Sequence, residues 1–276
     1  MHFLIQLSLK EKVLTDYIIA LEAIGAKYSF VGYFKDTNGF SGVPAIKDNF
    51  YSVSGISVLK TIANKNDIHF LDDYGNEIID DTIQERFTKS FFYSNPVNFD
   101  QKTAIDAGIP MLNKDAIFMD LNNHVNASFE SDMFIKPSDD LKSFIGGILP
   151  SGMSIRDFVL TKSSFMAGWD KGTVLIAPPR EIHSEYRFFV VNGEPVTGSS
   201  YFKEGEINIA LPIPDEVSIA SKNLASQFQP DIAFTMDLAL MKDGSISIVE
   251  YNCINTSGHY GCDLPLFLTT IKNYIN

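Results

Sequence analysis

Two carboxylates and an amide near the C-terminus have a spacing that places them on one face of a β-hairpin. The stretch MDLALMKDGSISIVEYN contains an Asp-Gly pair, which is a strong signal for a two-residue turn. If Asp243 and Gly244 form that turn, Asp237 lies opposite Glu250, with their Cβ atoms ~5 Å apart. Asn252 then lies on the same face, because side chains alternate along a strand.

Like charges that face each other across a sheet destabilise it, so this arrangement needs an explanation. A loop one residue longer would remove the direct opposition, and a protonated carboxyl would remove one charge. A divalent cation is the third explanation, because hard cations such as Mg²⁺ take carboxylate and amide oxygens. Three oxygen ligands on one hairpin face favour the metal. We therefore expect that neutralising Asp237 or Glu250 leaves the fold intact or stabilises it by relieving the repulsion.

Cationic side chains upstream have two interpretations each. Arg187 follows Glu185 by two residues in the strand-like stretch SEYRFFVVNG, as part of either a surface ion pair or a phosphate grip. Lys136 ends the apolar run MFIK, where a lysine either extends to solvent or binds phosphate, and Lys142 lies six residues later. Neither G-x-x-x-x-G-K-[ST] nor G-x-G-x-x-G occurs, so a P-loop and a dinucleotide fingerprint are excluded.

The elements that must position these residues change in character along the chain. The first third alternates strand-like stretches such as HFLIQLSL and YSFVGYF with a helical stretch, EKVLTDYIIALEAIGAK, and this predicts an open α/β domain. Residues 96–121 look helical, with breaks at Gly108 and Pro110. From residue 133 onward, short strands and hairpins with an amphipathic helix, DEVSIASKNLASQFQPD, predict an α+β region.

Composition limits the class of protein. The 276 residues are 45% hydrophobic, which is enough for a substantial core. The net charge of −12 argues against a grip on nucleic acid, which needs clustered cations. No apolar run approaches the ~20 residues of a membrane span, and the N-terminus lacks the basic start of a signal peptide. With two cysteines and no export signal, we expect free thiols and a cytoplasmic protein.

The order of the motifs resembles the ATP-grasp superfamily. These motifs are FIKP, VLIAPP, EYRFFVVNG, MDLAL and VEYN, and they look most like those of a small branch found in phages and bacteria. The resemblance covers roughly residues 100–276, and the Asp…Glu-x-Asn hairpin is its most specific part. It implies an α/β domain at residues 1–97, followed by an α+β ATP-grasp domain at 98–276. The central (98–178) and C-terminal (179–276) subdomains of the latter would clamp a nucleotide between antiparallel sheets.

The resemblance also implies ATP and Mg²⁺ as cofactors and gives each candidate residue a role. Mg²⁺ would be held by Asp237, Glu250 and Asn252. ATP would be held by Lys136, Lys142, the hinge Leu175, Ile176 and Ala177, and, at the ribose, Glu185 or alternatively Glu181. The residues nearest the chemistry would be Lys136, Arg187 on the transferred phosphoryl group, and Asn255 near the γ-phosphate and the acceptor.

The implied activity is a ligase that joins a carboxylate to an amine through an acyl-phosphate at the expense of ATP. Its substrates would be an amino acid, a peptide or a protein. Two alternatives stay open: a non-catalytic Mg-ATP-binding module, and a phosphotransferase on the same fold. The stretch KPSDDLKSFIGG lacks the glycine-rich loop of many members, and this departure supports the module.

Two details of the resemblance stay unassigned. Many members carry an earlier ATP-binding lysine, for which Lys102 and Lys114 are both candidates. Cys253, His259 and Cys262 supply three zinc-ligand types in the order C-x5-H-x2-C, but this spacing is not standard, and structural loop residues are the favoured interpretation.

Overall fold

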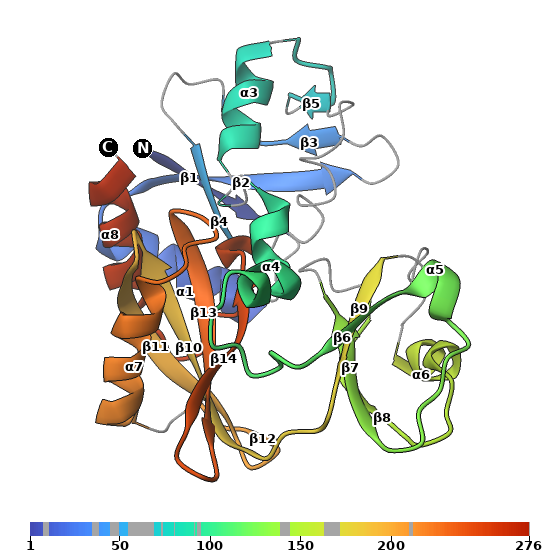
Figure 1. The fold of residues 1–276 in the computed structure, drawn as a ribbon. Helices are drawn as coiled ribbons and strands as arrows, with labels where there is room; N and C mark the ends of the chain where they lie inside the picture. The colour runs from blue at the N-terminus through green and yellow to red at the C-terminus, as the bar shows by residue number, and fades with distance from the viewer. Residues whose placement is uncertain are drawn as a thin grey trace.

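The structure is a computed structural model, and the part of the chain that it describes contains three β-sheets (Figure 1). It describes residues 1–7, 11–34, 39–44, 50–54, 69–72, 74–79, 81–90, 92, 95–138, 144–162, 172–209 and 212–275. Within these residues, no helix is both long enough and apolar enough to cross a lipid bilayer.

The N-terminal sheet is of the mixed α/β type that the sequence predicts. Its strand order is β4-β1-β2-β3-β5, and β1 pairs in parallel with both β2 and β4. Helix α1 connects β1 to β2, as the crossover between parallel strands requires. The elements of this part are β1 (His2–Gln6), α1 (Glu11–Ala23), β2 (Lys27–Phe34), β3 (Gly39–Ser41), β4 (Phe50–Ser54), β5 (His69–Leu71) and α3 (Asp81–Lys89).

The central sheet has the order β6-β9-β7-β8, and each of its strand pairs is antiparallel. Its core is formed by Ile135, Leu149, Phe158 and Val174 with their neighbours. The elements are β6 (Ile117–Asp120), α5 (Leu121–His124), β7 (Met133–Pro137), β8 (Gly147–Leu149), α6 (Ile155–Lys162) and β9 (Thr173–Ala177).

The helical prediction for residues 96–121 is correct only in its first half. This segment begins with η1 (Pro96–Phe99) and α4 (Gln101–Asp106), which ends at the break predicted near Gly108. Strand β6 then follows, and it pairs with β9 along its whole length. The apolar run IFM is too short for its periodicity to distinguish a strand from a helix, so its pairing with β9 determines that it forms a strand.

The C-terminal sheet is antiparallel, with the order β12-β11-β10-β13-β14. The amphipathic helix predicted in this region forms as α7 and packs against β11 and β13. The elements are β10 (Ile182–Val191), β11 (Glu194–Lys203), β12 (Glu206–Ile207), α7 (Asp215–Ala225), β13 (Ala233–Met241), β14 (Ile246–Asn252), η2 (Ile254–Thr256) and α8 (Leu264–Ile275).

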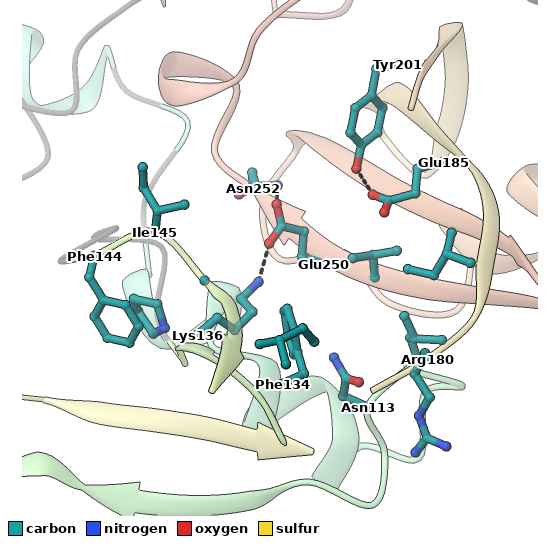
Figure 2. A pocket seen from close by; sticks show the side chains of 16 residues that line it. Asn113, Phe134, Lys136, Phe144, Ile145, Arg180, Glu185, Tyr201, Glu250 and Asn252 are labelled. Carbon is teal, nitrogen blue, oxygen red and sulfur yellow. Dashed lines mark hydrogen bonds and ion pairs between the residues drawn. The ribbon is translucent and has the colours of Figure 1, made fainter. Parts of the chain in front are cut away.

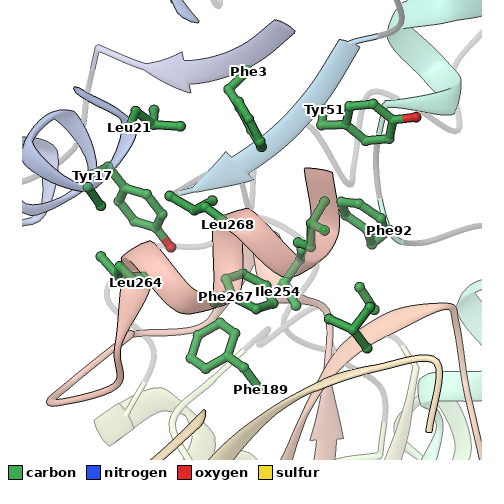
Figure 3. Packing of buried hydrophobic residues seen from close by; sticks show 14 of the residues in the cluster. Phe3, Tyr17, Leu21, Tyr51, Phe92, Phe189, Ile254, Leu264, Phe267 and Leu268 are labelled. Atoms are coloured by element: carbon green, nitrogen blue, oxygen red, sulfur yellow. The ribbon is translucent and has the colours of Figure 1, made fainter. Parts of the chain in front are cut away.

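Helix α8 joins the N-terminal and C-terminal sheets through one core (Figure 3). Its buried residues Leu264, Phe267, Leu268 and Ile271 recur at helical spacing and form one apolar stripe. They share a cluster with residues of α1, β1 and β4, and with Phe189 of β10. Because this packing fixes the C-terminal sheet against the N-terminal one, the site described next rests on a rigid support.

Candidate active site

A cavity of about 440 Å³ lies between the central sheet and the C-terminal sheet (Figure 2). This volume falls in the range of ligand pockets, roughly 300–1,000 Å³. Apolar side chains of both sheets form much of its wall, including Phe134, Ile148, Ile182 and Val249. Polar groups converge on the rest of the wall, and they include residues predicted from the sequence.

Asp237 and Glu250 are directly paired across β13 and β14, as predicted, but by a different register. The loop is one residue longer than a two-residue turn, because Leu240 pairs with Ile246. A bulge between Asp237 and Leu238 then takes up the extra residue and restores the opposition.

Asp237 is neutralised by Arg187, its cross-strand neighbour on β10. The guanidinium donates from Nε to Oδ1 at 2.8 Å and from Nη2 to Oδ2 at 2.6 Å, while Nη1 donates to the Gly258 carbonyl at 3.2 Å. The rings of Tyr201 and Tyr260 flank it, with centroids 5.5 and 5.2 Å from Cζ. Asp237 is 0% exposed and Arg187 is 5% exposed. Burial alone would lower the pKa of Arg187, but Asp237 outweighs it and raises that pKa above the ordinary value.

Glu250 is neutralised from the opposite sheet. The Lys136 ammonium, at the end of β7, crosses the cavity and forms an ion pair with Glu250 Oε2 (Figure 2). The Asn252 amide donates to the other oxygen, Oε1, at 2.8 Å. All three residues line the cavity. The pair therefore bridges the two sheets that enclose the cavity.

The two ion pairs change the argument for a metal. Each facing carboxylate has its own protein cation, so their repulsion does not by itself require Mg²⁺. The donor chemistry still fits Mg²⁺, because a carboxylate and an amide line the cavity and are ligand types that this ion accepts. Both Asp237 oxygens, in contrast, are held by Arg187. The assignment of Asp237, Glu250 and Asn252 to a metal stays a prediction.

Glu185 lies on the cavity wall with Tyr201, whose hydroxyl donates to the Glu185 carboxylate. Burial raises the pKa of Glu185 to about 7, and the nearby charges of Asp237 and Glu250 add to that increase. Glu185 therefore titrates near neutral pH in the ligand-free cavity. The alternative ribose residue, Glu181, is exposed, pairs with Lys242 at 3.5 Å, and is not among the cavity-lining residues.

The predicted hinge residues Leu175, Ile176 and Ala177 form the end of β9 and are completely buried. None of the three is among the residues that line the cavity, so the segment after them is what remains for contact with a base. Arg180, in that segment, does line the cavity and pairs with Asp115. Lys142 lies outside the described residues.

Asn255 is placed away from the cavity wall. Its amide donates to the carbonyl of Ser52 on β4, and its Oδ1 accepts from the Cys253 thiol at 2.9 Å. These bonds tie η2 to the N-terminal sheet. Asn255 is completely buried and is not among the lining residues, so the structure does not bring it together with Lys136 and Glu250.

The remaining candidates lie apart from the cavity. Lys102 pairs with Asp106 on the exposed face of α4, and Lys114 lines a separate, smaller groove. Both cysteines are free and buried, and burial raises the pKa of Cys262 to about 12, so it is a poor nucleophile at neutral pH. Across the described part of the chain, no three His, Cys, Asp or Glu side chains gather as a metal site, so the zinc interpretation gains no support.

Three polar lining residues were not among the candidates from the sequence: Asn113, Arg180 and Tyr201. Asn113 comes from a turn before β6, and Tyr201 reaches the cavity through the pairing of β11 with β10. Only the tertiary arrangement brings them to Lys136 and Glu250.

Comparisons with known proteins identify the family and the fold of the chain. A family model described as an ATP-grasp domain, the third family of its clade, matches residues 73–270. No curated protein sequence matches the chain. Several solved structures share the fold over nearly the whole of both chains.

The D-alanyl-alanine synthetase A of Vibrio cholerae O1 biovar eltor str. N16961 is similar with a TM-score of 0.56 and 12% identity, covering 100% of this chain and 99% of that one. The D-cycloserine synthetase DcsG is similar with a TM-score of 0.54 and 11% identity, covering 100% of this chain and 99% of that one. The ATP-grasp ligase PsnB is similar with a TM-score of 0.51 and 14% identity, covering 98% of this chain and 97% of that one. Its structure is a complex with a phosphomimetic variant of the minimal precursor, Mg and ADP. The predicted fold class is confirmed, whereas the domain boundaries at residues 97 and 178 stay predictions.

Proposed function

The chain belongs to the ATP-grasp domain family whose model matches residues 73–270, and we propose that it is an ATP- and Mg²⁺-dependent ligase that joins a carboxylate to an amine. The observation that carries this proposal is the cavity in which Lys136 of one sheet meets Glu250 of the facing sheet, beside apolar walls suited to a base. The names of the structural neighbours support substrates of the amino-acid, peptide or protein class. PsnB is a ligase with a precursor bound, and the other two are synthetases of D-cycloserine and D-alanyl-alanine.

ATP would place its base against the apolar walls and its phosphates near Lys136. A lysine at 15% side-chain exposure keeps its charge focused on the cavity, where a phosphate replaces the Glu250 carboxylate as its partner. Glu185 would accept hydrogen bonds from the ribose hydroxyls, and Tyr201 holds its carboxylate in place. The base would meet the backbone after Ala177.

Mg²⁺ would be held by Glu250 and Asn252, with Asp237 behind them, and it would supply charge neutralisation for the phosphates. Release of Lys136 from Glu250 frees both groups at once, the amine for phosphate and the carboxylate for the cation. The ion pair therefore keeps both groups in place in the ligand-free cavity. Since each group has an oppositely charged partner in either state, the exchange leaves no uncompensated charge.

The reaction would run in two steps. An oxygen of the substrate carboxylate attacks the γ-phosphorus, the bond from γ-phosphorus to the bridging oxygen breaks, and ADP leaves. The nitrogen of the amine then attacks the acyl carbon, the acyl carbon–oxygen bond breaks, and phosphate departs as the amine loses its proton. No protein nucleophile takes part, in agreement with the raised pKa of Cys262. Arg187 and Asp237 are not among the residues that line the cavity, but Arg187 is fixed by two bonds to Asp237, so its charge would be in place before phosphoryl transfer begins.

Two measurements test the proposal. A non-hydrolysable ATP analogue is titrated calorimetrically into the wild type and Glu250→Gln, with and without Mg²⁺. We expect Mg²⁺-dependent binding that the variant loses. ADP release is then measured with candidate carboxylates, with and without an amine.

Each outcome separates the ligase from its alternatives. ADP release that rises when the amine is added supports a ligase. Binding without ADP release under any condition would instead indicate a non-catalytic module. ADP release that continues beyond one equivalent per enzyme without an amine, and that the amine does not change, would indicate a phosphotransferase. Absence of nucleotide binding contradicts the proposal altogether.

A further inference from the structure

In the described part of the chain, one buried side-chain oxygen of a cavity-lining residue has no hydrogen-bond partner. Asn113 is 3% exposed, and its Oδ1 accepts no hydrogen bond from any residue that the structure describes. A buried amide oxygen without a partner costs roughly 1–3 kcal/mol, so folded proteins rarely keep one without a reason.

Backbone hydrogen bonds on both sides of Asn113 hold the turn that carries it. The Leu112 amide donates to the Ile248 carbonyl of β14 at 2.7 Å, and the Asn113 carbonyl accepts from the Ala116 amide at 3.0 Å. Neither bond involves the Asn113 side chain. Many residue types would therefore serve the turn equally well, and the turn does not explain an amide at this position.

The surroundings of Asn113 are those of a site for a flat, partly polar ring. Figure 2 shows its amide between Phe134 and Arg180, on the wall across from Glu185. Ile182 and Val249 add apolar surface to the wall of the same cavity. The phosphate-binding end, with Lys136 and Glu250, lies beyond Phe134 (Figure 2).

From this geometry we infer that Asn113 hydrogen-bonds the edge of the adenine base and makes the cavity selective for ATP over GTP. The inference rests on the proposed function, because it assumes that the cavity binds ATP. An asparagine amide carries an acceptor and two donors, and it matches the adenine edge, where an amino group lies beside a ring nitrogen. Oδ1 is closed to the empty cavity, so the amide would turn about its Cβ–Cγ bond to present an acceptor to the base, and a bound base would then supply the hydrogen bond that Oδ1 lacks in the free protein.

The experiment compares three ligands in calorimetric titrations: the non-hydrolysable analogues of ATP and GTP, and tripolyphosphate, each with Mg²⁺. Tripolyphosphate has no base, so it reports the phosphate end alone. The proteins are the wild type, Asn113→Leu, Asn113→Asp and the control Asn223→Leu, which alters an exposed asparagine of α7. Urea unfolding of each ligand-free protein supplies a second readout.

We expect the wild type to prefer the ATP analogue at least tenfold. Asn113→Leu should lose about 10- to 100-fold in affinity for that analogue, most of the preference over GTP, and none of the affinity for tripolyphosphate. Without ligand it should be at least as stable as the wild type, because an unpartnered buried amide is gone. If Asn113 served only the fold, Asn113→Leu would instead be less stable than the wild type. Asn113→Asp keeps an acceptor but loses the donor, so it should also weaken analogue binding, and Asn223→Leu should match the wild type.

Several outcomes would overturn the inference. These are wild-type affinity of Asn113→Leu for the ATP analogue, equal losses for the analogue and tripolyphosphate, and a wild type that does not discriminate between the two analogues. If Asn113→Leu fails to fold, the same criteria apply to Asn113→Asp. A wild type that binds none of the three ligands overturns the proposed function as well, so the two failures are distinguishable.

Discussion

Replacing Asp237 by asparagine tests whether the buried ion pair with Arg187 or the repulsion from Glu250 dominates at this hairpin. The repulsion argument from the sequence predicts an unchanged or more stable protein. The structure reverses that sign, because Asp237→Asn leaves a guanidinium that is 5% exposed without its carboxylate.

The expected loss can be worked from the contacts. Removal of one partner of a buried ion pair costs about 3–5 kcal/mol. Arg187 would keep the Gly258 carbonyl and the flanking faces of Tyr201 and Tyr260, and these contacts favour the lower end of that range. We therefore expect Asp237→Asn to lower the free energy of unfolding by about 3 kcal/mol, a large part of the ~5–15 kcal/mol typical of a protein.

The assay is urea unfolding, followed by far-ultraviolet and near-ultraviolet circular dichroism to check that both probes report one transition. Glu250→Gln is the matched control, because its ion pair, with side chains 15% and 24% exposed, is less deeply buried and its loss should cost less, about 1–2 kcal/mol. The double variant Arg187→Met with Asp237→Leu removes both charges and should recover much of the loss. An Asp237→Asn protein that is as stable as the wild type would refute the reasoning and restore the repulsion argument.

Three further predictions follow from single sites. Burial raises the pKa of Glu185 from 4.5 to about 7, so the folded state holds its proton more tightly than the unfolded state. The free energy of unfolding should therefore fall by on the order of 1–3 kcal/mol between pH 4.5 and pH 8, and urea unfolding of Glu185→Gln should lack most of that fall. Lys136→Met should weaken binding of the ATP analogue at least tenfold in calorimetry, and unchanged affinity would remove Lys136 from the phosphate site. Gly42→Ala would place a Cβ 2.1 Å from a carbonyl oxygen of β2 at φ +79°, whereas Gly75→Ala at φ +82° meets nothing within 4 Å. In urea unfolding, Gly75→Ala should lower the free energy of unfolding by about 1–3 kcal/mol, and Gly42→Ala should lower it further. Equal losses in the two variants would contradict the steric argument.

The hairpin of β13 and β14 shows how far sequence reasoning reaches. The Asp-Gly signal located the turn, and the alternation of side chains placed Asp237 opposite Glu250, where the structure has it. The loop length was wrong by one residue, and a bulge that no local signal predicts cancelled the error. Strand type and face are local properties, whereas a bulge depends on how the whole sheet twists.

The site shows the limit of the same reasoning. Lys136 and Glu250 were both identified as candidates, but their ion pair joins residues 114 positions apart and depends on how two sheets face each other. The Arg187–Asp237 pair was also missed, since the pairing order of β10 beside β13 is not written in either strand. Asn113 has no motif, and only its burial and missing partner distinguish it.

The turn that presents Asn113 also affects how the molecule behaves in concentrated solution. Strand β14 is the last strand of its sheet, and an open edge of this kind is a template for pairing with another chain. Here Ile248 donates to the Pro110 carbonyl at 3.2 Å and accepts from the Leu112 amide at 2.7 Å, so the middle of that edge is already occupied. The opposite edge is β12, which is only two residues long. Both borders of the sheet are thus blunted against self-association, one of them by the segment that reaches into the cavity.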